Sequence, residues 1–302
     1  MKNLIKKMLF GEYEPKQYLT FSIKENEVKE RAFIHIDGQQ IDISKTHFTL
    51  CQNPYMIGVW LPKNIKEESN PSVEIQLANE PMLRSKCSLN EVIEFETGNL
   101  WLLELVKTQY YFINYFHQKA VVGFFYWKQK HKVSFEELDH FCAMYSYPRS
   151  VILTCFGTPN DYNLFPMDLR GGIEEAGLYF LGLRNTNVTL KKMLKAQKVV
   201  VCGIAANQKK HILALGAHHS TQPPSLEKLP FNCIASEKFG FPVPAIVSDY
   251  RELIIQQYLD KGSHTIMICK VVNKVVFKED FASLHHQHIV TALKLDSTYT
   301  QI

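Results

Sequence analysis

The sequence lacks the features of a membrane protein or a nucleic-acid-binding protein. Its apolar runs are short: the run from Ala120 to Trp127 spans eight residues, whereas a membrane-spanning helix needs about 20, and its composition favours a buried strand. The charges nearly balance, with 34 Lys and Arg against 30 Asp and Glu, so no cationic surface for DNA or RNA is predicted. We therefore expect neither a membrane nor a nucleic acid as a partner.

Paired cysteines are missing as well. The seven cysteines are widely spaced and include no Cys-x-x-Cys, a pattern that favours free thiols in a reducing compartment. The N-terminal segment carries Lys2, Lys6 and Lys7, but Glu12 and Glu14 follow where the apolar region of a secretory signal would continue. We predict a cytoplasmic protein.

The common catalytic and metal-binding motifs are also absent. No Gly-x-Gly-x-x-Gly follows a predicted strand, and the sequence has no Walker loop and no Gly-x-Ser-x-Gly elbow. His285, His286 and His288 have no cysteine or carboxylate at metal-ligand spacing, so we interpret them as a solvated cluster. His218 and His219 are adjacent and would point to opposite faces of a strand. We therefore predict no metal site.

The sequence is instead a succession of strand patterns with few helix signals. The clearest helix signal is the capping box of Ser134 and Glu137, which predicts a helix that runs to about Tyr145. The balance predicts a mainly β protein, a β-barrel with a few short helices rather than a doubly wound parallel sheet. We place a β-rich domain over residues 1–133 and a second domain over 134–302.

The segment from Asp161 to Gln197 contains the most polar loop chemistry. We expect a polar loop over 161–175, a strand over 178–183, and a second loop, 185–189, that opens a helix. Loops and helix N-termini present amide hydrogens that hold phosphate well, so one interpretation is a phosphorylated ligand between the two loops. The other is that Asn185 and Thr189 cap a helix and Arg170 is a surface cation.

Several short segments, in the same order and at similar spacing, resemble the flavin reductase family, whose fold is an FMN-binding split β-barrel. They are Tyr147-Pro-Arg-Ser-Val-Ile-Leu-Thr154, 163–171, 178–183, Asn185-Thr-Asn-Val-Thr189, Gly240-Phe-Pro-Val-Pro244, Asp249-Tyr-Arg-Glu252 and 262–271. The resemblance covers about residues 145–280. It implies an FMN-binding split barrel in the C-terminal half, with FAD as an alternative cofactor and NAD(P)H as a co-substrate.

The resemblance also implies roles for individual residues. The first loop would line the flavin or its ribityl chain through the backbone of Pro166, Met167, Asp168 and Leu169. The phosphate side would be formed by Arg170, Asn185, Asn187 and Thr189. His264 would be the catalytic candidate, at the reacting face of the flavin ring.

Two positions depart from the family pattern. A serine-rich segment is replaced by Phe165–Arg170, in which Asp168 would repel a phosphate unless it turned away. Ser263 stands where an acidic residue precedes the turn histidine. The second departure bears on reductase activity more than on flavin binding.

The implied function is that of an FMN-binding flavoprotein, an NAD(P)H-dependent oxidoreductase with a small-molecule redox partner. The alternatives are a non-enzymatic flavin-binding or electron-carrier module and an interaction protein whose barrel has lost its ligand. In the N-terminal half, Ile43–Leu61 echoes the loop-then-strand order of 168–183. That half is therefore either a diverged second barrel or an unrelated β domain, and the chain could pair as a homodimer or within itself.

Overall fold

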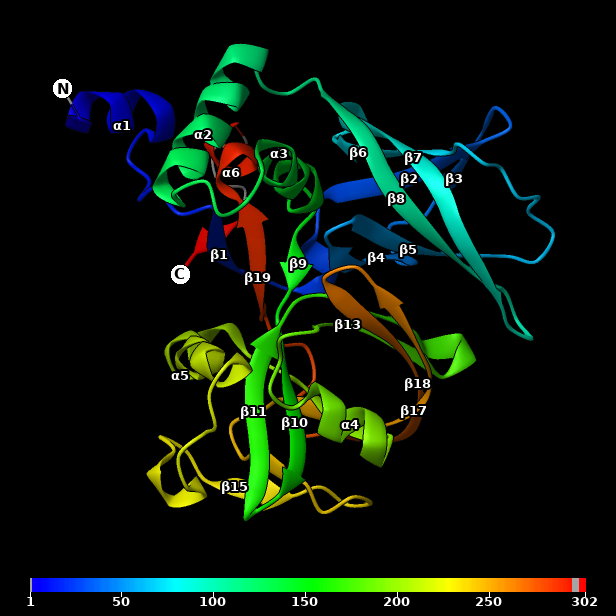
Figure 1. Ribbon diagram of the computed structural model, residues 1–302, viewed down its shortest axis with the longest axis vertical. Coiled ribbons are helices and arrows are strands. Elements are labelled where there is room, and N and C mark those ends of the chain that lie inside the picture. The colour runs from blue at the N-terminus through cyan, green and yellow to red at the C-terminus, as the bar shows by residue number, and fades with distance from the viewer. Residues whose placement is uncertain (1, 295–298) are drawn as a thin grey trace. The chain divides into compact units, whose positions relative to one another are not determined.

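The computed structural model describes residues 2–294 and 299–302. The chain divides into two compact units. The first comprises the chain up to Phe21, Val28–Arg149 and the segment from His286 to Gln301, and the second comprises Ser22–Glu27, Ser150–His285 and Ile302. Each unit has its own seven-stranded antiparallel sheet (Figure 1).

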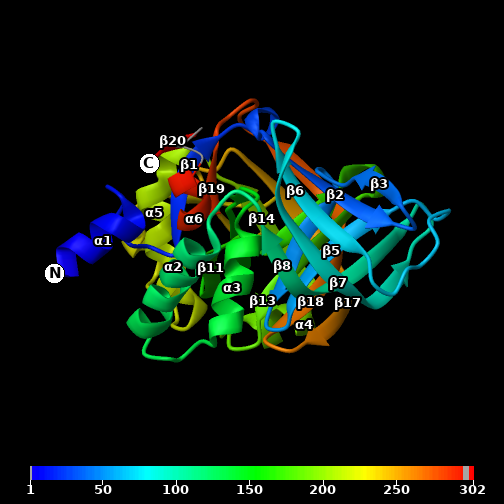
Figure 2. The ribbon, with the colours of Figure 1, turned by 90° about the horizontal axis from the view of Figure 1, so that it is seen from above.

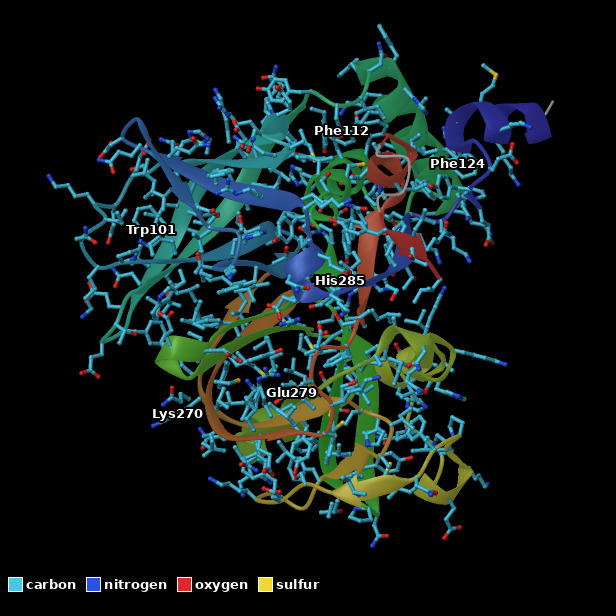
Figure 3. The ribbon with its side chains drawn as sticks, turned by 180° about the vertical axis from the view of Figure 1, so that it is seen from behind. Trp101, Phe112, Phe124, Lys270, Glu279 and His285 are labelled. Atoms are coloured by element: carbon cyan, nitrogen blue, oxygen red, sulfur yellow. The ribbon has the colours of Figure 1, made fainter. Side chains whose placement is uncertain are left out.

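The sheet of the first unit has the strand order β3-β2-β6-β7-β8-β5-β4. Its strands are β2 (Glu30–Ile36), β3 (Gln39–Asp42), β4 (His47–Gln52), β5 (Tyr55–Leu61), β6 (Ser72–Leu77), β7 (Glu80–Glu94) and β8 (Asn99–Tyr110). Strand β5 is buried along its whole length, so it packs on both faces. Trp101, on β8, is fully buried in the core of this sheet (Figure 3).

Four helices belong to the described part of the first unit: α1 (Lys2–Phe10), α2 (Tyr115–Lys128), α3 (Phe135–Met144) and α6 (Ile289–Lys294). The prediction of a buried strand over Ala120–Trp127 is wrong, because Asn114 caps a helix there by accepting a hydrogen bond from the amide of Phe116. The helix buries one face at helical spacing. Helices α2 and α3 lie side by side (Figure 2).

The helix predicted from the capping box is confirmed as α3. The hydroxyl of Ser134 accepts a hydrogen bond from the amide of Glu137 at 3.0 Å, and the Glu137 carboxylate accepts one from the amide of Ser134 at 2.7 Å. These two bonds satisfy donors that a helix otherwise leaves unpaired at its N-terminus.

The sheet of the second unit has the strand order β11-β10-β14-β17-β18-β13-β12. Its strands are β10 (Ile152–Thr158), β11 (Asp161–Met167), β12 (Arg170–Ile173), β13 (Leu178–Arg184), β14 (Lys198–Gly203), β17 (Asp249–Lys261) and β18 (His264–Val276). The long strands β17 and β18 curve strongly (Figure 3). The polar loop expected over 161–175 is wrong, because both β11 and β12 form there as partners of β10 and β13.

The two sheets share one topology. When the seven strands of each unit are numbered along the chain, the spatial order is the same in both. In this correspondence the connection and hairpin Ile43–Leu61 occupy the same place as 168–184. The mainly β fold is therefore confirmed, and the shared order supports the alternative in which the N-terminal half is a second copy of the same fold.

Short helices and strands complete the second unit. The helical elements are η1 (Glu25–Glu27), η2 (Glu174–Ala176), α4 (Leu190–Ala196), η3 (Ala206–Gln208), α5 (Lys209–Ala214), η4 (Leu215–His219) and η5 (Leu226–Lys228), and a two-stranded sheet is formed by β15 (Cys233–Ala235) and β16 (Pro242–Pro244). Helix α4 packs against β14, whereas α5 and η4 pack against β11. His218 and His219 thus lie on a helical turn and not on a strand.

The remaining elements are β1 (Tyr18–Ile23), β9 (Arg149–Ser150), β19 (Ser283–His288), α6 (Ile289–Lys294) and β20 (Thr300–Gln301). The four strands form a sheet of order β20-β1-β19-β9, and the division between the units falls within β1, β9 and β19. The expected solvated cluster of His285, His286 and His288 is wrong: all three are buried on β19. Within the described part of the chain, no helix has the length and apolarity to span a bilayer, and no group of side chains is arranged to hold a metal ion.

Candidate functional site

The residues assigned to flavin binding converge on one end of the second unit's sheet. Strand β11 ends there, β12 and β18 begin there, and β13 ends there. The first connection, residues 168–169, joins β11 to β12. In it, the carbonyl of Leu169 accepts a hydrogen bond from the amide of Gly182 at 2.8 Å. The second connection, residues 185–189, joins β13 to α4. Arg184, the residue just before it, is the register partner of His264. Two connections that are separate in sequence are therefore neighbours in space.

Asn185 fastens the second connection to the turn between β17 and β18. Its amide nitrogen Nδ2 donates to the carbonyl of Gly262 at 2.9 Å, and its backbone amide donates to the carbonyl of Ser263 at 3.0 Å. Its Oδ1 accepts from the hydroxyl of Thr265 at 2.9 Å. Asn185 therefore positions the turn that carries His264.

Asn187 and His219 join the second connection to η4. The Asn187 side chain accepts a hydrogen bond from the amide of Thr189 at 2.8 Å, and its Nδ2 lies 2.8 Å from Nδ1 of His219. Burial lowers the pKa of His219, and the nearby Arg184 lowers it further, whereas the carbonyl of Pro166 and the carboxylate of Asp168 raise it. The net lowering keeps the imidazole neutral at pH 7, as an acceptor at Nδ1 must be.

His219 therefore faces both connections at once. It contacts the carbonyl of Pro166, at the end of β11, and the side chain of Asn187, and the charges of Asp168 and Arg184 act on its pKa. No local signal pointed to this role, because adjacent histidines on a strand would face opposite ways. The helical turn that carries His219 depends on how η4 packs on β11, which is tertiary information.

Thr189 is tied to β11 through Asn163, a residue that the sequence analysis did not single out. The hydroxyl oxygen of Thr189 accepts a hydrogen bond from Nδ2 of Asn163 at 2.5 Å, and the same nitrogen donates to the carbonyl of His218 at 2.9 Å. Ring nitrogen Nδ1 of His218 in turn lies 2.9 Å from the carbonyl oxygen of Leu164. The Thr189 hydroxyl keeps its own proton for a further acceptor.

Two buried polar atoms of strands β10 and β11 have no hydrogen-bond partner among the residues that the structure describes. They are Oδ1 of Asn163 and Oγ1 of Thr154. Thr154 faces Phe165 across the β10–β11 pair, and Asn163 faces Phe156, so both side chains project from the same face.

The backbone amides of the second connection are largely used within the protein. The amides of Asn187, Val188 and Leu190 donate to the carbonyls of Arg184, His219 and Asn187, at 2.9, 3.2 and 3.2 Å. The amide of Thr189 is taken by the Asn187 side chain. Thr189 precedes α4, but its side chain makes no capping hydrogen bond to that helix. Ligand-binding donors from this connection must therefore be mainly side chains.

Two arginines lie beside the converging connections, at the start of β12 and the end of β13. Arg184 is exposed, and Arg170 is half-buried with its guanidinium donating to the hydroxyl of Ser150. Asp168, in the first connection, adds one negative charge that is half-buried, whereas the pair of Lys192 and Asp161 lies at the opposite end of β11. The balance of Arg170, Arg184 and Asp168 is one positive charge.

The first connection is held mainly by strand pairing. Pro166 and Met167 are the register partners of Leu153 and Ile152 on β10, so their backbone is part of the sheet. Asp168 and Leu169 are the two residues between β11 and β12.

His264 is buried at the start of β18. Its Nδ1 lies 2.7 Å from the hydroxyl of Ser263, the residue that departs from the acidic family pattern. The serine hydroxyl thus contacts the imidazole directly, in place of a carboxylate.

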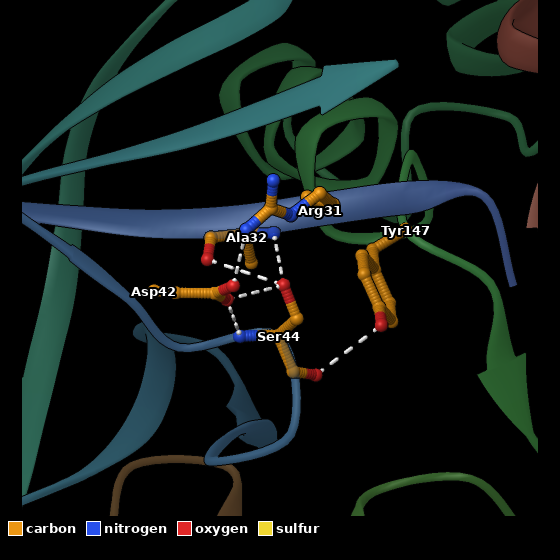
Figure 4. A network of polar contacts seen from close by, with 5 residues as sticks. All are labelled: Arg31, Ala32, Asp42, Ser44 and Tyr147. Carbon is orange, nitrogen blue, oxygen red and sulfur yellow. Dashed lines mark hydrogen bonds and ion pairs between the residues drawn. The ribbon is translucent and has the colours of Figure 1, made fainter. Parts of the chain in front are cut away.

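In the first unit, the connection from β3 to β4 corresponds to the first connection of the second unit. There the carboxylate of Asp42 binds the nearby hydrogen-bond donors (Figure 4). Asp42 accepts hydrogen bonds from the amide and the hydroxyl of Ser44, at 2.9 and 2.6 Å, and from the guanidinium of Arg31 at 2.6 Å. Tyr147 donates to the Ser44 carbonyl at 3.2 Å. The donors that could hold an anionic group here already hold Asp42, so the second unit is the better candidate for a ligand.

The comparisons with known proteins find solved structures only. No family model matches the chain, and no curated protein matches it. The NADH:FAD oxidoreductase of Streptomyces globisporus is 15% identical over 49% of this chain and 88% of its own, with a TM-score of 0.44. An FMN-binding protein from Thermus thermophilus is 18% identical over 43% of this chain and 73% of its own, with a TM-score of 0.38.

A flavoredoxin from Methanosarcina acetivorans is 13% identical over 43% of this chain and 69% of its own, with a TM-score of 0.37. These three solved structures are an NADH:FAD oxidoreductase, an FMN-binding protein and a flavoredoxin, and the sequence resembles the same group of flavin proteins.

Proposed function

We propose that the second unit binds a flavin, FMN in the first instance and FAD as the alternative, and that the protein is an NAD(P)H-dependent flavin oxidoreductase of the flavin reductase type. The observation that carries the proposal is the convergence of both connections and the His264 turn on one end of the sheet. The resemblance in sequence assigns the same segments to the flavin without any knowledge of their proximity.

The side chains at this end partly fit a flavin phosphate. Arg170 and Arg184 supply two positive charges, and charge-assisted hydrogen bonds to phosphate are among the strong ones. The Thr189 hydroxyl retains a proton that it can donate. Because the amides of 187–190 are engaged, we assign the phosphate to these side chains and not to the backbone of the second connection.

A bound flavin would supply hydride chemistry with a nicotinamide, so the protein needs no nucleophile or carboxylate pair of its own. The tasks of the chain are then to hold and orient the ring. Asn185 fixes the turn that carries His264, and Ser263 orients its imidazole. We place His264 at the reacting face, with a small-molecule redox partner as acceptor.

The test is a titration of the purified protein with FMN, followed by its visible spectrum and by quenching of flavin fluorescence. We expect saturable binding and bleaching when NADH or NADPH is added without oxygen. Arg184→Gln should weaken FMN binding by roughly tenfold or more, since a hydrogen bond to a charged group contributes about 1.5–3 kcal/mol. Lys270→Gln is the matched control, because Lys270 is an exposed cation paired with Leu178 at the opposite end of β13.

One observation favours a second candidate, an interaction protein whose sheet no longer takes a ligand. The four amides from Asn187 to Leu190 and the side chains of Asn185 and Asn187 are all satisfied internally. A colourless protein that takes up neither FMN nor FAD would establish this candidate and exclude the flavoprotein. Binding without bleaching by NADH or NADPH would identify a passive flavin carrier.

A further inference from the structure

Helix α2 of the first unit is apolar on two opposite faces. Its inner face buries Gln118, Val121, Val122 and Phe125. The outer stripe is Phe116, Ala120, Gly123 and Trp127, at intervals of four, three and four residues, which keep these positions on one side of a helix. Phe116 is 79% exposed and Trp127 is 71% exposed. A surface helix normally pairs an apolar face with a polar one, and a helix that is apolar all round is normally buried.

The stripe is complementary to itself. Its spacing is symmetric about the bond between Val121 and Val122, so a copy of the helix turned end for end places Phe116 opposite Trp127 and Ala120 opposite Gly123. The two small residues form the centre, and a Cβ added to Gly123 would meet no other atom within 4 Å. Small central residues let two helix backbones approach closely, and the aromatic rings then pack at both ends.

The charges favour the same antiparallel arrangement. Lys128, Lys130 and Lys132 are exposed at the C-terminal end of α2 and just beyond it. In an antiparallel pair the two lysine groups lie at opposite ends, whereas a parallel pair would bring like charges together. The antiparallel pair also sets each helix C-terminus beside the N-terminus of the other, where the helix dipoles attract.

The exposed area sets the expected strength. An aromatic side chain buries about 150–250 Å², so Phe116, Trp127 and the neighbouring Tyr115, which is 66% exposed, offer about 400–500 Å² per chain. Stable interfaces bury about 1,200–2,000 Å² in total. Two copies of the stripe would bury about 800–1,000 Å² in total, which is below that range and corresponds to a weak dimer that dissociates on dilution.

We propose that two copies of this chain associate about a two-fold axis through the outer stripe of α2, with Phe116 of each copy packed against Trp127 of the other. Such an interface is isologous, since the same patch serves both copies. The proposal is independent of flavin binding.

The chain contains its own reporter for this contact. Of its three tryptophans, Trp60 and Trp101 are buried, so Trp127 is the one that a quencher in solution reaches. Light scattering after gel filtration should give a dimer mass at high concentration and a monomer mass on dilution. As the protein is diluted through the same concentration range, acrylamide should quench tryptophan fluorescence more strongly, because Trp127 becomes exposed in the monomer.

Charge variants test the pairing itself. F116E and W127K should each be monomeric with unchanged circular dichroism. Mixing them should restore a dimer, because the introduced carboxylate meets the introduced ammonium at one end while the native Phe116 and Trp127 meet at the other. Phe277→Glu is the control, since Phe277 is an exposed aromatic of the second unit.

A wild-type chain that stays monomeric at the highest concentrations, or F116E and W127K chains that remain dimeric, would overturn the proposal. So would a monomer that binds vesicles of phosphatidylserine and phosphatidylcholine in a Trp127-dependent way, because the stripe would then serve a lipid surface. Failure of the mixed pair to associate would exclude the antiparallel register.

Discussion

Replacement of Thr154 by Val should stabilise the second unit, although most core substitutions destabilise. Thr154 is fully buried on β10, and its hydroxyl has no hydrogen-bond partner among the described residues. A buried hydroxyl without a partner costs about 1–3 kcal/mol in proteins, and valine has nearly the same shape and an equal preference for strands. We expect a gain of about 1 kcal/mol or more in the free energy of unfolding.

The assay is differential scanning calorimetry, in which about 1 kcal/mol corresponds to roughly 2–4 °C in a domain of this size. All three tryptophans lie in the first unit, so tryptophan fluorescence should report an unchanged transition there. The matched control is Thr265→Val. The Thr265 hydroxyl is equally buried but bonds Asn185 and Asp260, so its loss should lower stability by about 1–2 kcal/mol. A lower melting temperature for Thr154→Val would refute the reasoning and show that the hydroxyl has a partner, such as a buried water.

Thr189→Val should lower the stability of the second unit by about 1–2 kcal/mol, because Nδ2 of Asn163 loses an acceptor, and should weaken FMN retention; intact retention in a folded variant would remove this hydroxyl from the site. Gly157→Ala should destabilise by roughly 3 kcal/mol or more in urea unfolding, since φ is +96° and a Cβ would collide with the Asp161 carbonyl oxygen. Gly177→Ala, with φ at +62° and open space, should cost only about 1 kcal/mol, and equal costs for the two variants would contradict the steric argument. Burial lowers the pKa of His288 to about 3. As the pH falls below about 6.5, the unfolded chain therefore binds a proton at this residue before the folded chain does. The free energy of unfolding of the first unit should fall by up to about 5 kcal/mol by pH 3. His288→Leu should flatten that dependence in tryptophan-monitored unfolding, and an unchanged slope would show that other groups cause it.

Local signals in the sequence were sufficient for strands such as β10 and β14 and for α3, but not for β11 and β12, where a polar loop was expected. The capping box of Ser134 and Glu137 acts within four residues, and the apolar runs of β10 and β14 exclude most alternatives. The run from Ala120 to Trp127 failed because a short apolar run fits a buried strand and a buried helix equally well, and the cap that decides between them, Asn114, lies outside the run.

The candidate site was predictable as a set of segments but not as a network. The order of the segments placed 166–170, 185–189 and His264 together, and the structure brings them to one end of a sheet. Asn163 and His219 escaped detection because their partners are 26 and 32 residues away in sequence. Hydrogen bonds at such separations depend on the completed fold, and no local pattern encodes them.

The return of the chain from the second unit to the first has a consequence for synthesis on the ribosome. Domains usually fold one after another as they emerge, the N-terminal one first. Here the buried carboxyl of Glu30 is bonded by Gln287 and Tyr299, which are translated more than 250 residues later. The core of the first unit therefore stays incomplete until the second unit has been translated and Gln287 and Tyr299 have left the ribosome.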